Sequence, residues 1–119
     1  YGGEEFSVLL INTQTHAASV IAERIRSAIE TYRFQYVDND RQTHFLSTSI
    51  SIGIGQLPSQ IPNSNIASLC TSLVKQADRA LYAAKSNGRN QVILASSLKP
   101  SRKETGIRND NSPSMAIPE

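Results

Sequence analysis

The sequence predicts an α+β fold in which helices pack on a mixed β-sheet. Two long segments repeat apolar residues every three or four positions, as amphipathic helices do. The segments around them either alternate with the period of two typical of strands or are apolar on both faces. Helix-capping and turn-forming residues separate these segments. The predicted order is strand, helix, hairpin, strand, helix, strand.

The first predicted strand, residues 5–12, is apolar on both faces, as expected of a central strand covered on two sides. The helix that follows is expected to be capped by Thr13 or Thr15 and to end near Arg33. The face of this helix opposite its apolar stripe is interpreted as a solvated surface. It carries Glu23, Arg24, Arg26, Glu30 and Arg33. His16 has no partner at metal-ligand spacing, so we assign it no metal or catalytic role.

Residues 34–37 and 42–46 flank an Asp-Asn-Asp-Arg turn and are predicted to form a hairpin. Asp38 and Asp40 have carboxylate oxygens, which are ligands that metal ions such as Ca²⁺ prefer. Because the rest of a calcium loop is missing around them, we interpret both as turn residues. His44 on the second arm is expected to have a structural role.

Residues 46–55 alternate most cleanly, with isoleucines on one face. The other face is small and consists of Ser47, Ser49, Ser51 and Gly53. Two interpretations of this small face stay open. It leaves room for a ligand against the sheet, or it accommodates a closely packed helix.

A second long helix is predicted over residues 66–87, with Ser64 or Asn65 as its N-terminal cap and Gly88 at its C-terminal end. The single cysteine, Cys70, lies on its apolar stripe, which predicts a buried and reduced cytosolic thiol.

Lys85 lies in the last turn of this helix and Arg89 just beyond its end, where cations interact favourably with the helix dipole. That electrostatic role explains both residues without any ligand. Residues 90–95 are expected to form a last short strand.

The composition limits the range of functions. A chain of 119 residues forms at most one small domain, and a net charge of +2 provides no clustered basic face for nucleic acid. No segment is long and apolar enough to cross a membrane, and no signal peptide is evident, so we expect a soluble chain.

Residues 96–119 contain few apolar side chains and are interpreted as a disordered tail whose basic residues, Lys99, Arg102 and Lys103, are solvated.

The chain opens with two glycines followed by two carboxylates, Glu4 and Glu5. Gly2 and Gly3 lack Cβ atoms, so the backbone there can turn sharply and approach a phosphate closely. Carboxylates beside such a gap suggest Mg²⁺, which binds oxygen ligands and shares them with substrate phosphates. The alternative is a glycine turn followed by two solvated glutamates.

Three segments together resemble a known family: YGGEEF, STSISIGIG and ADRALYAAKSNGRNQV, in this order. They are similar to the C-terminal half of a GGDEF domain, the diguanylate cyclase family, over residues 1 to about 95. The resemblance implies a ferredoxin-like, palm-type sheet that is N-terminally truncated here. It also implies an enzyme that condenses two GTP molecules into cyclic di-GMP and two pyrophosphates, with two GTP-loaded domains meeting as a homodimer.

The family resemblance assigns roles to the matching residues. The glycines would let the backbone approach GTP, the glutamates would hold Mg²⁺ or Mn²⁺ or help deprotonate the attacking hydroxyl, and the two cations would neutralise the phosphates. The candidate site residues are Gly2, Gly3, Glu4, Glu5, Lys85 and Arg89.

The family pattern includes further parts that would precede Tyr1: a first strand with a metal-binding aspartate, the side chains that read guanine, and an Arg-x-x-Asp inhibitory motif. We therefore expect the chain to be part of a longer protein, with a sensor or membrane domain upstream, and to be inactive alone. The resemblance implies a cytoplasmic location, including attachment at the inner face of the cell membrane. The alternative function is a degenerate, non-catalytic module that binds GTP or a protein partner, although the intact glycine-glutamate turn favours an enzyme.

Overall fold

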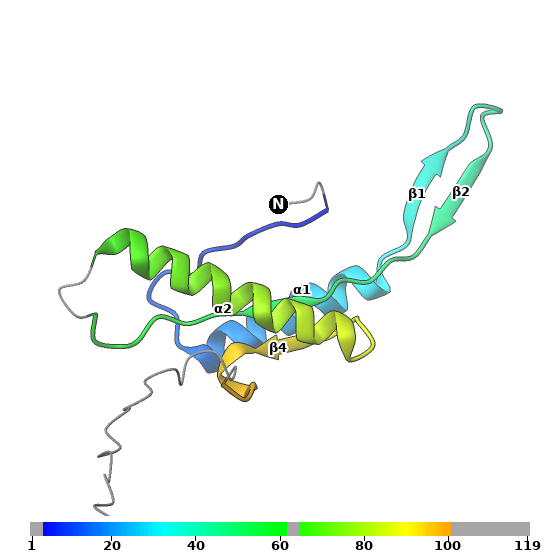
Figure 1. The fold of residues 1–119 in the computed structure, drawn as a ribbon. Helices are drawn as coiled ribbons and strands as arrows, with labels where there is room; N and C mark the ends of the chain where they lie inside the picture. The colour runs from blue at the N-terminus through cyan, green and yellow to red at the C-terminus, as the bar shows by residue number, and fades with distance from the viewer. Residues whose placement is uncertain (1–3, 62–64, 101–119) are drawn as a thin grey trace, which may run out of the picture.

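The computed structural model describes residues 4–61 and 65–100, and Figure 1 shows their arrangement. Within these residues the chain forms α1 (Thr15–Thr31), β1 (Phe34–Val37), β2 (Thr43–Leu46), β3 (Ile52–Ile54), α2 (Ile66–Ser86), β4 (Val92–Leu94) and the 3-10 turn η1 (Ala95–Ser97). The strands make two separate two-stranded sheets, β1–β2 and β3–β4. The predicted α+β class is confirmed at this level.

The β3–β4 sheet is the element that both long helices contact (Figure 1). Its strands are parallel, with Ile52 opposite Val92 and Ile54 opposite Leu94. Parallel neighbours need a long crossover connection, and α2 supplies it. Both α1 and α2 contact the two strands, so this sheet joins the helices into one unit.

The small face of β3 packs directly against α2. A Cβ atom on Gly53 would overlap backbone atoms of Ala77 and Leu81, and one on Gly55 would lie 2.7 Å from the carbonyl oxygen of Leu73. Of the two interpretations of this face, close packing under a helix is therefore the one that applies at the glycines. The strand itself is shorter than predicted, because only residues 52–54 pair with a neighbour.

The buried centre of the described residues is built from alanines. Ala18 and Ala22 of α1 are 7% exposed, while Ala80 and Ala84 of α2 are completely buried. Alanine lets a helix backbone approach its neighbours closely, but each such side chain buries little apolar area. In the part of the chain that the structure describes, no large side chain is fully buried.

The prediction of a buried Cys70 is wrong, because its thiol is exposed. The helix carries the predicted stripe, but its first turns extend beyond the β3–β4 sheet, as the left-hand end of α2 in Figure 1 shows. Ile66 at the start of the same stripe is 75% exposed. An apolar stripe thus predicts which face of a helix turns inward, but not how far along its length a partner covers it.

The prediction of a strand over residues 5–12 is also wrong. The segment runs extended past the helices (Figure 1), but it pairs with no strand among the described residues. Its apolar side chains are consequently exposed, from 92% at Phe6 to 37% at Leu10. A β-strand is stabilised by hydrogen bonds to its neighbours, so a strand-like sequence without a neighbour remains an unpaired extended segment.

The helix caps agree with prediction at α2 and disagree at α1. The side chain of Asn65 accepts a hydrogen bond from the Ala67 amide at 2.9 Å, as predicted, while Ser64 lies outside the described residues. At α1 the cap position is Gln14, whose side chain makes no capping bond. Thr13 instead donates to the Ile11 carbonyl at 2.9 Å. The predicted threonine cap is therefore wrong, and the hydroxyl of Thr15 bonds to Gln56.

The predicted hairpin is confirmed, with Phe34 opposite Leu46 and Tyr36 opposite His44. Its turn is held by Asp38, whose carboxylate accepts hydrogen bonds from the amides of Asp40 and Gln42 at 2.9 and 2.8 Å. The other carboxylate oxygen lies 2.6 Å from the His44 ring. The structural roles expected of these side chains are therefore confirmed.

The predicted tail begins at residue 96, but Ser96 and Ser97 belong to η1. The backbone continues past η1 to Lys99, whose carbonyl accepts a hydrogen bond from Arg79 of α2. Residues 101–119, which include most of this tail, lie outside the described residues. Among the described helices, none has the length and apolar character needed to span a membrane.

Candidate functional site

Glu5 and Lys85 form an ion pair across 80 positions of sequence. The Nζ atom of Lys85 donates to Oε1 of Glu5 at 3.0 Å. The side chain of Lys85 is 42% exposed and that of Glu5 is 36% exposed, so solvent reaches both. Two of the six candidate site residues are thus brought together by the fold. One comes from the opening segment, residues 4–12, and the other from the last turn of α2.

The other four candidate site residues take no part in the Glu5–Lys85 contact. Gly2 and Gly3 lie outside the described residues. Glu4 is exposed next to Glu5, and Arg89 is exposed four residues after Lys85. Among the described residues, neither the Glu4 carboxylate nor the Arg89 guanidinium forms a hydrogen bond or an ion pair.

The end of α2 sets where the two cations lie. The amide of Asn87 donates to the Ala83 carbonyl and the amide of Arg89 donates to the Ala84 carbonyl, both at 2.9 Å. Gly88 between them has φ +113°, a left-handed conformation that a side chain would strain. Gly88 therefore ends α2, as predicted, and the bond from Arg89 to Ala84 is that of a Schellman motif. It folds the backbone of Arg89 back over the turn that carries Lys85.

A second polar cluster, which sequence reasoning missed, joins α1 to the loop after α2. Arg26 donates to Glu23 at 2.6 Å, to Glu30 at 2.7 Å and to the side chain of Asn90 at 2.8 Å. Its side chain is only 14% exposed, so the solvated surface predicted for this face is wrong at Arg26. The spacing of Glu23, Arg26 and Glu30 along one helix was visible in the sequence, but the link to Asn90, 64 residues away, was not.

These contacts change the pKa values of the charged groups in the cluster. The hydrogen bonds from Arg26 lower the pKa of Glu23 below its ordinary value of 4.5. The pKa of Glu30 is lowered too, first by Arg26 and then by the hydrogen bond from Asn90. The same bonds raise the pKa of Arg26, with Glu23 the largest cause and Glu30 the next. The cluster is therefore held in its charged form at neutral pH.

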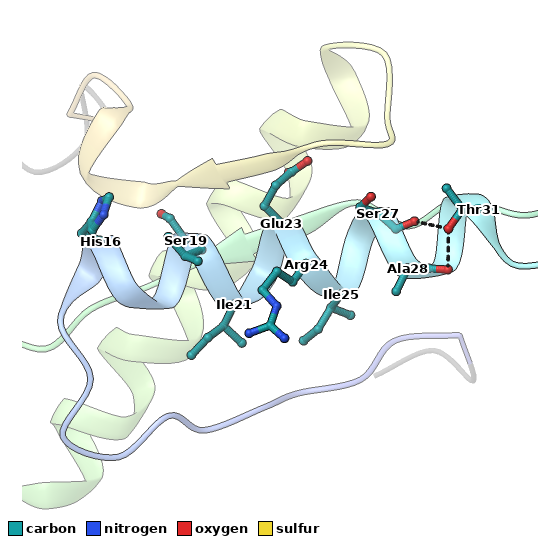
Figure 2. A pocket seen from close by; sticks show the side chains of 10 residues that line it. His16, Ser19, Ile21, Glu23, Arg24, Ile25, Ser27, Ala28 and Thr31 are labelled. Atoms are coloured by element: carbon teal, nitrogen blue, oxygen red, sulfur yellow. Dashed lines mark hydrogen bonds between the residues drawn. The ribbon is translucent and has the colours of Figure 1, made fainter.

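A groove runs along α1 and is separate from the candidate site. Figure 2 shows the side chains that line it, with Ile21, Arg24 and Ile25 pointing to the side where the opening segment passes. At the far end the hydroxyl of Thr31 donates to the carbonyl oxygens of Ser27 and Ala28 (Figure 2). None of the four candidate site residues that the structure describes lines this groove.

The donor set at the opening segment is compatible with a divalent cation shared with a nucleotide. Mg²⁺ is commonly bound by one or two carboxylates together with substrate phosphates and water. Glu4 and Glu5 supply two adjacent carboxylates that solvent reaches. The described residues contain no group of three or more acidic, histidine or cysteine side chains that could hold a metal alone. A cation here would therefore need further ligands from outside the described residues, such as nucleotide phosphates.

The chemistry available at the Glu5–Lys85 pair is electrostatic. Lys85 presents a positive charge at a position that a phosphate can reach, and Glu5 presents a proton acceptor or cation ligand within 3.0 Å of it. Because both side chains are partly exposed, their mutual attraction is weak and can be exchanged for other partners at little cost. The pair is therefore well suited to open when an anion binds Lys85.

The chain is thus an α+β protein with adjacent carboxylates beside a helix-end lysine. The family model described as "Diguanylate cyclase, GGDEF domain" matches residues 1–91. The chain therefore belongs to the GGDEF family, as its three sequence segments indicated.

Curated relatives support this assignment. The chain is 39% identical over 100 residues to "Diguanylate cyclase A" of Treponema denticola, an alignment that covers 84% of this chain and 24% of that protein. It is 36% identical over 93 residues to "Probable diguanylate cyclase DgcT" of Escherichia coli (strain K12), covering 78% of this chain and 19% of the relative. An "Uncharacterized membrane protein" of Staphylococcus aureus (strain USA300) is 35% identical over 93 residues, with 78% and 24% covered. The chain spans about a quarter or less of each relative's length.

Proposed function

We propose that this chain is the C-terminal part of the catalytic domain of a diguanylate cyclase, which condenses two GTP molecules into cyclic di-GMP and two pyrophosphates. The observation that carries the proposal is the 3.0 Å contact between Glu5 and Lys85. It links a carboxylate of the family's signature turn to a helix-end cation from a different signature segment. Membership of the GGDEF family and relatives named diguanylate cyclase support it.

In this proposal each site residue has a separate task. Gly2 and Gly3 let backbone amides approach the nucleotide, because no Cβ atom stands in the way. Glu4 and Glu5 hold Mg²⁺ or Mn²⁺, or accept the proton of the attacking hydroxyl. When bound, the cation offsets charge on the phosphoryl oxygens. Lys85 and Arg89 neutralise the remaining phosphate charge, as the family resemblance implies.

The Glu5–Lys85 contact fits this proposal, because Glu5 and a phosphate would compete for the same lysine. Without a nucleotide the lysine neutralises one of the two adjacent carboxylates and so reduces their repulsion. With a nucleotide present, its phosphates take over Lys85 and release Glu5. Because the pair is half-exposed, breaking it costs little binding free energy.

The reaction needs two domains, each holding one GTP molecule. The 3′-hydroxyl of one GTP attacks the α-phosphate of the other, and pyrophosphate leaves. Negative charge on the phosphoryl oxygens must be stabilised throughout, so this chain's contribution is positioning and positive charge. The partner is accordingly a second GGDEF domain of the same kind, which makes the working form a homodimer.

The proposal also includes a longer, palm-type domain. Residues 5–11 are apolar on both faces, yet among the described residues no strand pairs with them. A further strand, supplied by residues upstream of this chain, would pair with this segment and cover its exposed side chains. The family pattern places a metal-binding aspartate on that strand and the side chains that read guanine after it. A sensor or membrane domain upstream and a cytoplasmic catalytic domain complete the proposal.

Product formation by the longer protein tests the function. It is incubated with Mg²⁺ and GTP, and nucleotides are separated by chromatography. We expect cyclic di-GMP and two pyrophosphates per product molecule, with loss of both when the cation is chelated. Binding of GTP without any product would instead identify the non-catalytic module, and absence of both would remove GTP from the proposal.

A further inference from the structure

The loop after α2 has an unusual backbone. Gly88, Arg89 and Asn90 are consecutive residues with φ values of +113°, +64° and +48°. Glycine adopts this region readily and asparagine tolerates it, but an arginine is strained there by its Cβ atom. Such strain persists only where the surroundings hold the backbone in place, and it frequently accompanies a functional role.

Asn90 provides this support from both its backbone and its side chain. Its amide donates to the hydroxyl of Ser51 at 3.2 Å, which ties the loop to the segment before β3. Its side-chain nitrogen donates to Glu30 at 2.7 Å, and its side-chain oxygen accepts from Arg26 at 2.8 Å. Asn90 is therefore fixed from two directions, and its backbone in turn fixes the residue before it.

The guanidinium groups of Arg26 and Arg89 differ in their contacts. Arg26 is 14% exposed, and its guanidinium donates to Glu23, Glu30 and Asn90. Within the described part of the chain, the guanidinium of Arg89 has no hydrogen-bond or ion-pair partner, and only its backbone is held. Arg26 is thus committed to protein contacts, while Arg89 is held at its backbone with its charge available to a ligand.

We propose that Arg26, Glu30 and Asn90 form a positioning network that fixes the left-handed backbone of Arg89 and so orients its guanidinium toward the phosphates bound beside Lys85. The inference rests on the proposed function, because it assumes that a nucleotide's phosphates occupy this end of α2. Arg26 and Asn90 are positioning residues, which act on the ligand through Arg89.

A double-mutant cycle for Mg·GTP binding tests the network, with affinities measured by NMR titration of the full 119-residue chain. The chain carries the proposed phosphate contacts but not the guanine-reading side chains, so we expect a dissociation constant of roughly millimolar order. Arg89→Met should weaken binding at least about tenfold, the scale of one hydrogen bond to a charged group. Arg26→Met and Asn90→Gly should each weaken binding to a similar extent. Asn90→Gly removes the side-chain contacts while the left-handed backbone stays accessible.

The decisive comparison is made in the Arg89→Met background. If Arg26 acts through Arg89, adding Arg26→Met there should weaken binding no further, whereas a general loss of structure would weaken it again. Glu30→Gln, which keeps an oxygen acceptor for Asn90, should retain most of the affinity. Arg24→Met on the exposed side of the same helix is the matched control and should leave binding unchanged. Melting temperatures identify any variant that fails to fold, in which case Asn90→Gly carries the test.

The possible failures can be told apart. If the wild-type chain binds Mg·GTP and Arg89→Met weakens binding while Arg26→Met and Asn90→Gly do not, the positioning inference is overturned and the proposed function stands. If the wild-type chain does not bind Mg·GTP, or Arg89→Met has no effect, the placement of the phosphates is wrong. The inference then fails together with the proposed site.

Discussion

Gly53 of β3 lies directly under Leu81 of α2. A Cβ atom on Gly53 would come 2.8 Å from the Cα atom of Leu81 and would overlap its amide nitrogen. The atoms that would have to move belong to the helix backbone, which cannot rotate away as a side chain can. The helix can lie this close to the strand only because position 53 has no side chain.

Gly53→Ala should therefore reduce the free energy of unfolding by about 1–3 kcal/mol, the usual cost of overpacking. Urea denaturation followed by circular dichroism measures the effect. Ser49→Ala, at an exposed position of the preceding segment, is the control and should unfold at an unchanged urea concentration. An unchanged midpoint for Gly53→Ala would show that α2 does not rest on β3 in solution.

Replacing the signature carboxylates should abolish most formation of cyclic di-GMP by the longer protein. Glu4→Ala or Glu5→Ala should lower the rate of cyclic di-GMP formation at least ~100-fold, the scale of losing one electrostatic contributor to a transition state. The fold should survive, since both side chains are exposed. Asp40→Asn, at the tip of the hairpin, removes a carboxylate far from the site and serves as the control. Near-normal rates for both glutamate variants would mean that the segment is only a turn.

Lys85 and Arg89 should matter far more to GTP turnover than to stability. Lys85→Met or Arg89→Met should change the free energy of unfolding by under about 1 kcal/mol, because an exposed cation at a helix end contributes little. The rate of cyclic di-GMP formation at limiting GTP should fall at least about tenfold. Lys75→Met, at an exposed position on the same helix, is the matched control. A large drop in melting temperature with unchanged GTP kinetics would show that these cations only stabilise the helix.

Residues 1–119 alone should not make cyclic di-GMP. The segment 5–11 has no paired neighbour among the described residues. The proposed function places the family's metal aspartate and guanine-reading side chains before Tyr1. An incomplete site can bind phosphates weakly, but it cannot align two nucleotides for attack. Chromatography of the purified chain with Mg²⁺ and GTP makes the measurement. Turnover comparable to that of the longer protein would refute the assignment of the missing parts.

The charge cluster around Arg26 should make stability depend on acid pH. Contacts with Arg26 lower the pKa of Glu23 and Glu30 from 4.5, so the folded state binds protons less readily than the unfolded state. Their contribution is fully present above about pH 4.5 and is lost as the pH falls through the lowered pKa values. Melting temperatures measured from pH 7 to pH 3 should therefore fall less steeply in Arg26→Met than in the wild type. Equal slopes would show that the cluster does not form.

Local signals in the sequence predicted local structure well. Asn65 caps α2 and Gly88 ends it because both act on backbone groups within a few residues. The hairpin followed from its turn residues for the same reason. The prediction of a strand over residues 5–12 was wrong, because strand pairing depends on a neighbour that the segment itself does not specify.

The site was predictable only in part. The family resemblance singled out Glu5 and Lys85, but their 3.0 Å contact depends on how the opening segment passes α2. The burial of Arg26 and its bond to Asn90 required α1 to lie against the loop after α2, which is distant in sequence. The exposure of Cys70 depended on where the sheet under α2 stops. In each case the missing information was the identity of the partner.

The hairpin has a consequence for how the molecule opens. In the described structure β1 and β2 pair only with each other, and all eight of their residues are exposed. A two-stranded hairpin has little stability of its own. Its amide protons should therefore exchange with solvent through local unfolding long before those of β3 and β4. The turn around Asn39 is accordingly the place where the chain can accept inserted residues while α1, α2 and the Glu5–Lys85 pair keep their positions.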